Sequence, residues 1–348
     1  MSPQNLGQTY LDGETHPFVS IIIPAKNEEK ILPSCLDSIL SSDYPKNRFE
    51  ILLIDNGSTD KTIAIAQSHG LKIIDGSSFT IGAMRNLGVK ESHGDLIAFV
   101  DADVIVTKSW LASGVRCLQS HPNAACAGSF PLVPENFGWV AESWWFLQFP
   151  VNTNKEQKVE WLASMNIICR RDTFENIGGF NLNLMTAEDV DFCYRIGAGH
   201  DIFYCPAMIA YHYGEAQSLR QLFLKERWRG NSNYEGIRYH GFVKSELPSL
   251  LLPIINLTLY LTIFLAIITL DLKIFLIAIV LLILPSIVKS TLSYKKNPNT
   301  SFHGFLKMFI CYLVYSTART VACIDWLQNK VICKLKRQNK NGYNGGRL

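Results

Sequence analysis

Carboxylate and amide side chains follow three apolar runs in the first third of the chain, and their types and spacing could support chemistry. The first run leads into Pro24-Ala-Lys-Asn27-Glu28, and the second ends at Asp55. The third leads directly into Asp101-Ala-Asp103. Two carboxylates beside a buried run are costly without compensation. A hard divalent cation, Mg²⁺ or Mn²⁺, supplies that compensation and normally shares its ligand shell with substrate phosphate, so this pair indicates a metal and phosphate site.

These polar groups need a scaffold that gathers them in space. Short β-branched runs predict four strands, at 20–23, 51–54, 72–74 and 96–100. Apolar residues at helical spacing predict helices over 28–42 and 59–69. Strands alternating with helices favour a parallel, Rossmann-like α/β sheet, in which ligands bind at the carboxyl ends of the strands. Because no Gly-x-Gly-x-x-Gly or Gly-x-x-x-x-Gly-Lys motif follows a predicted strand, dinucleotide cofactors and P-loop chemistry are disfavoured.

The average composition describes a large, nearly neutral chain. Its 348 residues give room for one large or two ordinary domains, and a charged content of 18% is too low for a disordered scaffold. The formal net charge of +3 gives no reason to expect a nucleic-acid partner. Nine cysteines, none in a Cys-x-x-Cys motif, stand singly in apolar surroundings. They suggest buried, reduced thiols rather than a disulfide framework or a zinc site.

The charge is segregated along the chain. The net charge is −10 over residues 1–215, +3 over 216–246 and +10 over 289–348, and 247–288 contain only Asp271 and Lys273. The uncharged run 250–270 has the length of about 20 residues that a helix needs to cross a bilayer, and a shorter uncharged run follows at 274–288. We expect a transmembrane hairpin rather than a hairpin buried in a soluble core.

The basic residues on both sides of this hairpin predict its orientation. Both flanks should be cytoplasmic, which leaves only the turn at 271–273 outside. Residues 1–16 are polar and lack the apolar core of a signal peptide, so we expect a multi-pass protein of the cytoplasmic membrane whose head faces the cytoplasm. A third apolar stretch, 302–324, is interrupted by Lys307 and Arg319. It is either a third span or, more in keeping with the basic tail, an interfacial helix.

Six motifs, taken in their order and spacing, resemble the inverting family 2 glycosyltransferases, which have the GT-A fold. They are Ile21-Ile-Ile-Pro-Ala-Lys-Asn-Glu28, Ile54-Asp-Asn-Gly-Ser-Thr-Asp60, Arg85-Asn-Leu-Gly88, Gly94-Asp-Leu-Ile-Ala-Phe-Val-Asp-Ala-Asp103, Gly178-Gly-Phe180 and Glu188-Asp-Val-Asp-Phe-Cys-Tyr-Arg195. The resemblance covers roughly residues 18–230. It implies a GT-A α/β domain that takes a sugar from a nucleotide donor, with a divalent cation, Mn²⁺ or Mg²⁺, as cofactor.

The resemblance assigns the nucleotide side of the site residue by residue. Pro24, Asn27 and Glu28 would line the nucleotide site. Asp55 resembles the carboxylate that reads the uracil ring or its surroundings. Family members often have a second acid where this chain has Asn56, which leaves the identity of the base open.

The diphosphate and the metal are assigned in the same way. Asp101 and Asp103 resemble the pair that contacts the ribose and the metal-bridged diphosphate. Arg85 resembles a residue on the diphosphate side, with a structural salt bridge as the alternative. His212 follows an apolar strand and resembles a further metal ligand of some members, although a lone histidine is more often structural.

The acidic turn and the acceptor side complete the predicted site. Asp189 resembles the catalytic base, with Glu188 beside it and Asp191 as support; the alternative is that these acids only stabilise the start of a helix. The predicted acceptor-side residues are Gly179, Phe180, Arg227 and Trp228. Arg227-Trp228 also resembles the end of the Gln-x-x-Arg-Trp signature of processive synthases, but the glutamine position is Leu224 and the chain has few spans, so processive synthesis is disfavoured.

Together these features predict a membrane-anchored inverting glycosyltransferase. It is expected to move a sugar from a nucleotide donor, with UDP as the expected nucleotide, to a lipid-linked or other membrane-proximal acceptor. The alternatives are a nucleotidyltransferase and a non-catalytic partner subunit with the same fold. The predicted boundaries are a polar tail at 1–16, a GT-A domain at 17–215, a basic amphipathic juxtamembrane segment at 216–246, the hairpin at 247–288 and a basic region at 289–348.

Overall fold

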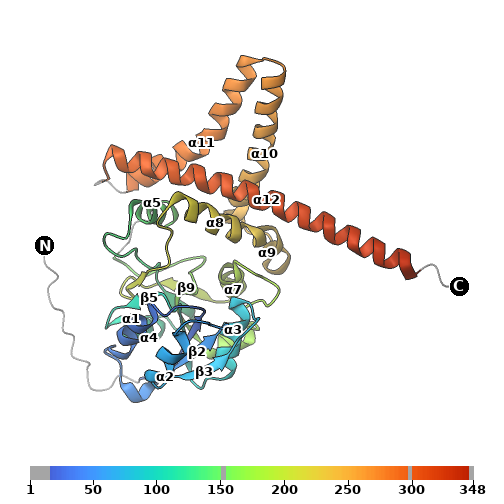
Figure 1. The fold of residues 1–348 in the computed structure, drawn as a ribbon. Coiled ribbons are helices and arrows are strands. Elements are labelled where there is room, and N and C mark those ends of the chain that lie inside the picture. Colours follow the sequence, from blue (N-terminus) through green and yellow to red (C-terminus); the bar gives the residue numbers. More distant parts are fainter. Residues whose placement is uncertain (1–15, 150–153, 297–299, 345–348) are drawn as a thin grey trace.

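The computed structural model describes residues 16–149, 154–296 and 300–344, and the side chains of 232–233 and 331–344 are not described. Residues 1–15 of the predicted polar tail and residues 345–348 therefore lie outside the described residues. Figure 1 shows an α/β head, a helical hairpin that stands away from it, and a long helix between the two.

The head is built on one mixed, mostly parallel sheet of eight strands with the order β3-β2-β1-β4-β8-β6-β9-β7. Its parallel half consists of β1 (Val19–Ala25), β2 (Phe49–Asp55), β3 (Lys72–Asp75) and β4 (Leu96–Val100). These are the four predicted strands, which are confirmed with slightly wider bounds.

The other half of the sheet was not predicted. It consists of β6 (Ala124–Gly128), β7 (Gln157–Lys158), β8 (Asn166–Arg170) and β9 (Asp201–Tyr204), with β8 antiparallel to both β4 and β6. A separate antiparallel pair joins β5 (Val104–Val106) to β10 (Ala210–His212). This pairing brings β5, which directly follows Asp103, next to β10, which ends at His212.

Helices cover both faces of the sheet. One core lies under α1 (Leu32–Leu40), α2 (Thr62–Ser68) and α4 (Trp110–Ser120), and the other under α3 (Ile81–Lys90), α6 (Arg171–Asn176) and α7 (Glu188–Gly197). A short 3₁₀ turn, η1 (Lys46–Arg48), precedes β2. The predicted helix over 28–42 begins late, at Leu32, because Asn27 has a positive φ of 57° and the Glu28 N–H is bound by the Thr62 hydroxyl.

The chain leaves the head through α8 (Leu219–Arg229), η2 (Gly230–Ser232), α9 (Asn233–His240) and η3 (Lys244–Glu246). It then forms the hairpin of α10 (Leu247–Ile268) and α11 (Leu272–Lys296). The hairpin helices pack on each other and expose many leucine and isoleucine side chains. Both are long and apolar enough to cross a membrane, and so is α12 (Phe302–Asn344) by the same criteria. Such a large exposed apolar surface is typical of a membrane-embedded element.

The long helix α12 runs across the base of the hairpin, between the hairpin and the head (Figure 1). It packs on α8 and on α5 (Trp139–Gln148) of the head, and on both hairpin helices. Trp144 of α5 lies against Tyr315 of α12, with ring centroids 5.0 Å apart. On α8, Arg227 forms an ion pair with Asp325 of α12 at 2.6 Å. The helix thus joins the head to the hairpin over much of its described length.

Candidate functional site

The predicted metal ligands meet where β5 pairs with β10. In this register His212 lies opposite Val104, next to Asp103, and the His212 Nε2 is 3.3 Å from the Asp103 Oδ2. The other ring nitrogen, Nδ1, lies 2.8 Å from the Glu215 Oε1. Gly214 lies so close that a Cβ there would overlap the Asp103 carboxylate. The backbone is therefore shaped to bring a carboxylate and an imidazole together.

Negative charge dominates this corner of the site. Burial disfavours the charged ring, but the carboxylates of Asp103 and Glu215 raise the pKa of His212 to about 10. Burial, together with repulsion from Asp103 and Asp101, raises the pKa of Glu28 to about 7. A cluster of carboxylates that needs positive charge, with an imidazole nitrogen beside it, fits a divalent cation such as Mn²⁺. Asp103 and His212 would hold such an ion.

Arg85 connects the two acidic segments. Its guanidinium donates to the Asp101 Oδ1 at 2.8 Å and to the Glu188 Oε1 at 2.7 Å, and its side chain is only 3% exposed. The Phe180 ring lies below it, 5.5 Å from the guanidinium carbon. The structure thus shows the salt bridge that was the alternative reading of Arg85. It places the Asp101-x-Asp103 pair beside the first turn of α7.

The three acids of that turn differ in their surroundings. Glu188 is 7% exposed and bound to Arg85, and Asp191 is fully buried and bound to Arg195 at 2.7 Å. Asp189 is less buried than either, and its Oδ1 accepts the Val190 N–H. Burial raises the pKa of Asp189, against the opposing effect of Arg85. Burial also raises the pKa of Glu188, to about 7, so what distinguishes Asp189 among the three is its partial exposure.

We expect Arg85→Met to destabilise the head strongly. Removing one partner of a buried ion pair leaves an uncompensated charge and costs about 3–5 kcal/mol. The thermal unfolding temperature of the full chain in detergent should fall sharply, and Glu188→Gln added to Arg85→Met should recover part of the loss. Arg116→Met is a matched control, because Arg116 forms no ion pair among the described residues. Equal unfolding temperatures for the two single variants would contradict this role of Arg85.

The nucleotide half of the site lies at the ends of β1 and β2. The Asn27 Oδ1 accepts the Thr59 N–H at 2.8 Å, which ties the two strand ends together. The Asp55 Oδ2 accepts the Ser58 N–H, but its Oδ1 is buried with no partner among the described residues. Asn56 is occupied, because its amide donates to the Phe79 carbonyl at 2.9 Å. Asp55 therefore offers a buried acceptor for a ligand N–H, next to Pro24 at the end of β1.

The predicted acceptor-side residues do not gather in one place. Phe180 is 1% exposed and packs against Phe192 in the core, so its ring supports Arg85 rather than facing an acceptor. Gly179, with a positive φ of 67°, is held by the Arg195 guanidinium, which donates to its carbonyl. Arg227 points to α12, where it and the exposed Trp228 line a cavity of about 400 Å³.

Sequence reasoning assigned no role in the site to two charged residues near His212, Glu215 and Lys225. Glu215 was not considered, although the His-Tyr-Gly-Glu spacing places it three residues from the ring that it binds. On α8, Lys225 donates to the Gly214 carbonyl, and Arg229 pairs with Glu226 at 2.7 Å and interacts with Asp189 and Glu215. Of the two arginines in the last turn of α8, Arg229 therefore interacts with the predicted base, whereas Arg227 pairs with Asp325 of α12.

We expect Arg227→Ala to change turnover little. The pair with Asp325 is partly exposed and screened by solvent, so its loss should change any rate that depends on it by less than about tenfold. The matched change is Arg229→Ala, two residues further along α8. It should reduce turnover more, because Arg229 interacts with Asp189. The measurement is release of nucleoside diphosphate at saturating donor. A larger loss in Arg227→Ala would place Arg227 at the diphosphate after all.

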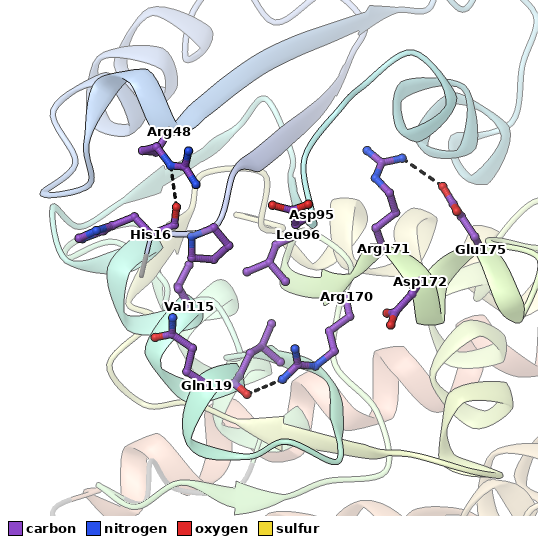
Figure 2. Close-up of a pocket in the computed structure, with 12 residues that line it drawn as sticks. His16, Arg48, Asp95, Leu96, Val115, Gln119, Arg170, Arg171, Asp172 and Glu175 are labelled. Atoms are coloured by element: carbon purple, nitrogen blue, oxygen red, sulfur yellow. Dashed lines mark hydrogen bonds and ion pairs between the residues drawn. The ribbon is translucent and has the colours of Figure 1, made fainter. Parts of the chain in front are cut away.

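A second cavity of about 850 Å³ lies at the opposite end of the parallel strands, where β1 and β4 begin (Figure 2). Its arginines are occupied by the protein itself. Arg48 donates to the His16 carbonyl, Arg170 to the Leu118 carbonyl, and Arg171 lies 3.2 Å from Glu175 (Figure 2). The cavity contains none of the predicted site residues, which lie at the carboxyl ends of the parallel strands, where α/β sheets bind ligands.

Comparisons with known proteins identify the family of this chain. Residues 20–178 match the family described as glycosyl transferase family 2. The chain is 30% identical over 207 residues to glycosyltransferase AglE of Haloferax volcanii, covering 55% of this chain and 67% of that protein. It is 27% identical to O-antigen chain rhamnosyltransferase RfbN of Salmonella typhimurium, covering 67% and 81% respectively, but spans only 18% of O-antigen biosynthesis protein RfbC of Myxococcus xanthus.

Among solved structures, the fold is shared with mannosyltransferase PcManGT from Pyrobaculum calidifontis, which was solved with GDP-Man and Mn²⁺. The TM-score is 0.58 at 15% identity, over 91% of this chain and 88% of that one. At this identity the likeness concerns the fold, and it includes the mostly parallel α/β sheet described above. The sequence matches and the shared fold together show that the chain belongs to the family 2 glycosyltransferases.

Proposed function

We propose that this protein is a membrane-anchored, inverting glycosyltransferase that moves a sugar from a nucleoside-diphosphate donor to a lipid-linked acceptor. The observation that carries the proposal is the joining of Asp101 to Glu188, the neighbour of Asp189, through Arg85, in a head that is followed by a helical hairpin with an exposed apolar surface. It supports a site in which Asp101 and Asp103 would bind the diphosphate and Asp189 would act as the base. The names of the relatives, a glycosyltransferase and a rhamnosyltransferase, support the same reaction class.

The proposed binding of the sugar donor is supported by a hydrogen-bond acceptor atom without a partner and by carboxylates that need positive charge. The unpartnered Asp55 Oδ1 would receive an N–H of the base, as the imide of uracil could supply. Pro24, Asn27 and Glu28 would form the adjoining wall, and Asp101 would receive the ribose hydroxyls. A divalent cation, Mn²⁺ or Mg²⁺, held by Asp103 and His212 would neutralise the diphosphate as it leaves. Lys225 and Arg229 add positive charge on the same side.

Asp189 would act as the general base for the acceptor hydroxyl. Its raised pKa favours proton abstraction, and its partial exposure lets an acceptor approach. Glu188, held by Arg85, would keep the turn in place. One base and one direct displacement at the anomeric carbon give inversion of configuration. The leaving diphosphate departs on the opposite side of the sugar from the incoming oxygen.

We propose that α10 and α11 span the cytoplasmic membrane with the head on the cytoplasmic side, because basic residues flank the hairpin at both ends. The helix α12 would lie in the interface, since it packs along the head and carries Lys307, Arg319 and Asp325. We propose a GT-A domain over 17–215, a basic juxtamembrane segment over 216–246, the hairpin over 247–288 and a basic region over 289–348. Trp228 and the cavity between α8 and α12 would then face the lipid acceptor.

The test uses the full chain in lipid nanodiscs with Mn²⁺, a polyprenyl-phosphate acceptor, and UDP- or GDP-linked sugars in turn. We expect release of nucleoside diphosphate and a glycosylated lipid with a UDP-linked donor. Product with GDP-linked donors alone would overturn uracil as the nucleotide base of the donor. Product on a soluble glycan alone would overturn the lipid acceptor. Donor binding without turnover on any acceptor would favour a non-catalytic partner subunit.

A further inference from the structure

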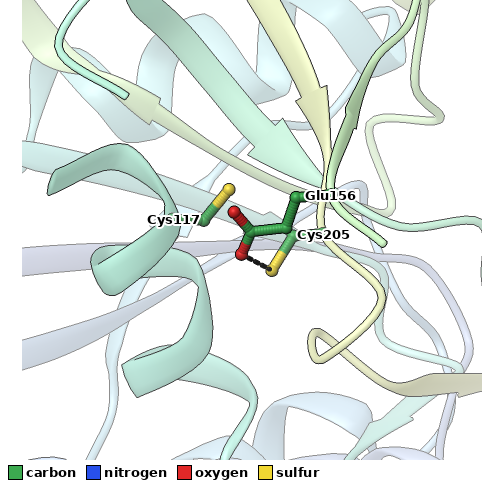
Figure 3. A group of neighbouring side chains, drawn as sticks. All are labelled: Cys117, Glu156 and Cys205. Carbon is green, nitrogen blue, oxygen red and sulfur yellow. Dashed lines mark hydrogen bonds between the residues drawn. The ribbon is translucent and has the colours of Figure 1, made fainter. Parts of the chain in front are cut away.

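Two cysteines and a glutamate meet far from the polar site, at the other edge of the sheet. Cys117 lies in the last turns of α4, Glu156 immediately precedes β7, and Cys205 immediately follows β9 (Figure 3). Their ligand atoms all lie within 4.8 Å of one another. The sequence suggested isolated buried thiols and no zinc site, because no Cys-x-x-Cys spacing is present. Tertiary structure brings together what the sequence keeps 39 residues or more apart.

The register of the sheet produces this meeting. In the antiparallel pair of β7 and β9, Gln157 lies opposite Tyr204, so the next positions outward are Glu156 and Cys205. The Cys205 Sγ lies 3.9 Å from the Glu156 Oε1. Cys117 is added from α4, which packs over this part of the sheet. Three separate elements therefore each direct one ligand atom to a common point, as Figure 3 shows.

The neighbours of these ligands favour a bound metal. His121, one turn after Cys117, lies with its Nε2 2.9 Å from the other carboxylate oxygen of Glu156, and its ring stacks on Phe203 with centroids 3.8 Å apart. Carboxylates that bind metals are usually held by a further hydrogen bond, and His121 can supply that bond to Glu156. Glu156 is exposed, which gives an ion a path from solvent.

We propose that Cys117, Cys205 and Glu156 bind a Zn²⁺ ion, with a water as the fourth ligand. Soft thiolates select zinc over Mn²⁺ or Mg²⁺, which prefer oxygen-rich sites. Three protein ligands and a water make the tetrahedral shell that zinc adopts. Binding releases the thiol protons to solvent as each sulfur becomes a thiolate ligand. The ion would tie α4 to the strand ends before β7 and after β9, independently of the sugar-transfer site.

The test titrates the full chain, in detergent, reduced and stripped of metal, with Co²⁺ and then with Zn²⁺. We expect a near-ultraviolet thiolate-to-cobalt absorption band that Zn²⁺ abolishes, and a rise in unfolding temperature with Zn²⁺. Cys117→Ser and Cys205→Ser should each weaken the band, and the double variant should lose it. His121→Phe keeps the stacking on Phe203 and should weaken binding by about 10- to 100-fold, the usual loss for an outer-shell partner.

Cys311→Ser is the matched control, since Cys311 is buried in α12 against α5, and it should leave the band unchanged. The oxygen-rich Asp103 site cannot produce a thiolate band, so the two sites are distinguishable by the spectrum. A band that persists in the double variant, or no band in the folded wild-type chain, would overturn the proposal. A disulfide between Cys117 and Cys205 in the protein as isolated would also overturn it.

Discussion

Asp189→Asn should abolish most of the turnover while donor binding is retained. Asparagine has nearly the same shape but cannot accept a proton, and a general base contributes about 10²–10⁴-fold. The expected result is therefore a loss of that order in kcat, with an unchanged Kd for the nucleotide sugar. Product formation and donor binding are measured separately, the second by calorimetry. Unchanged kcat would remove Asp189 from the role of base.

The pH dependence gives an independent check on the same residue. Asp189 acts as a base only when deprotonated, and burial raises its pKa above that of a free aspartate. The rate kcat/KM should therefore be low in acid and rise with pH through this raised pKa. The remaining rate of Asp189→Asn should lack this rise.

The matched control for this change is Asp191→Asn, two residues along the same helix. Asp191 is fully buried and paired with Arg195, which in turn binds the carbonyls of Ile177 and Gly179. This variant should lose stability, seen as a lower unfolding temperature, and should keep the pH dependence of the rate. The opposite pattern, with a stable but inactive Asp191→Asn, would exchange the roles of the two acids.

Asp103→Asn should cause the second large loss, through the divalent cation. The Asp103 carboxylate faces His212 at 3.3 Å, and a metal supplies several kcal/mol of charge stabilisation to a leaving diphosphate, which is about 100-fold or more in rate. Chelation of the wild-type protein should give a similar loss, and Mn²⁺ should restore activity only to the wild type. Electron paramagnetic resonance measures Mn²⁺ binding without reference to activity.

The control for Asp103→Asn is Asp37→Asn, since Asp37 is 74% exposed on α1 and its partner is His69, which is not part of the predicted site. It should keep both activity and Mn²⁺ binding. Full activity after chelation, with Asp103→Asn still inactive, would show that Asp103 acts without a metal.

Much of the fold could be predicted because its signals are local. The strands at β1, β2 and β4 are short apolar runs that end in polar residues, and the hairpin is a pair of uncharged runs, each visible within about 20 residues. The antiparallel half of the sheet escaped prediction because β6, β8 and β9 are short and separated by long connections. Their pairing depends on partners distant in sequence, which no local pattern reports.

The candidate site divides in the same way. Asp55, Asp101, Asp103 and the acidic turn could be identified because each follows a recognisable element and belongs to an ordered set of motifs. The contacts of Arg85 could not be chosen in advance, since its two carboxylate partners lie 16 and 103 residues away. Phe180 was expected to face an acceptor and instead lies in the core, because burial depends on packing and not on the motif.

The sequence by itself determined the reaction family, the predicted acidic ligands and the apolar hairpin, because these depend on residue type, order and local hydrophobicity. Only the tertiary structure decided which charges pair, where Arg227 points and how α12 lies between head and hairpin. It also brought Cys117, Glu156 and Cys205 together through the register of β7 and β9. The physical reason is that charge pairing and metal coordination act over a few ångströms in space, whatever the distance along the chain.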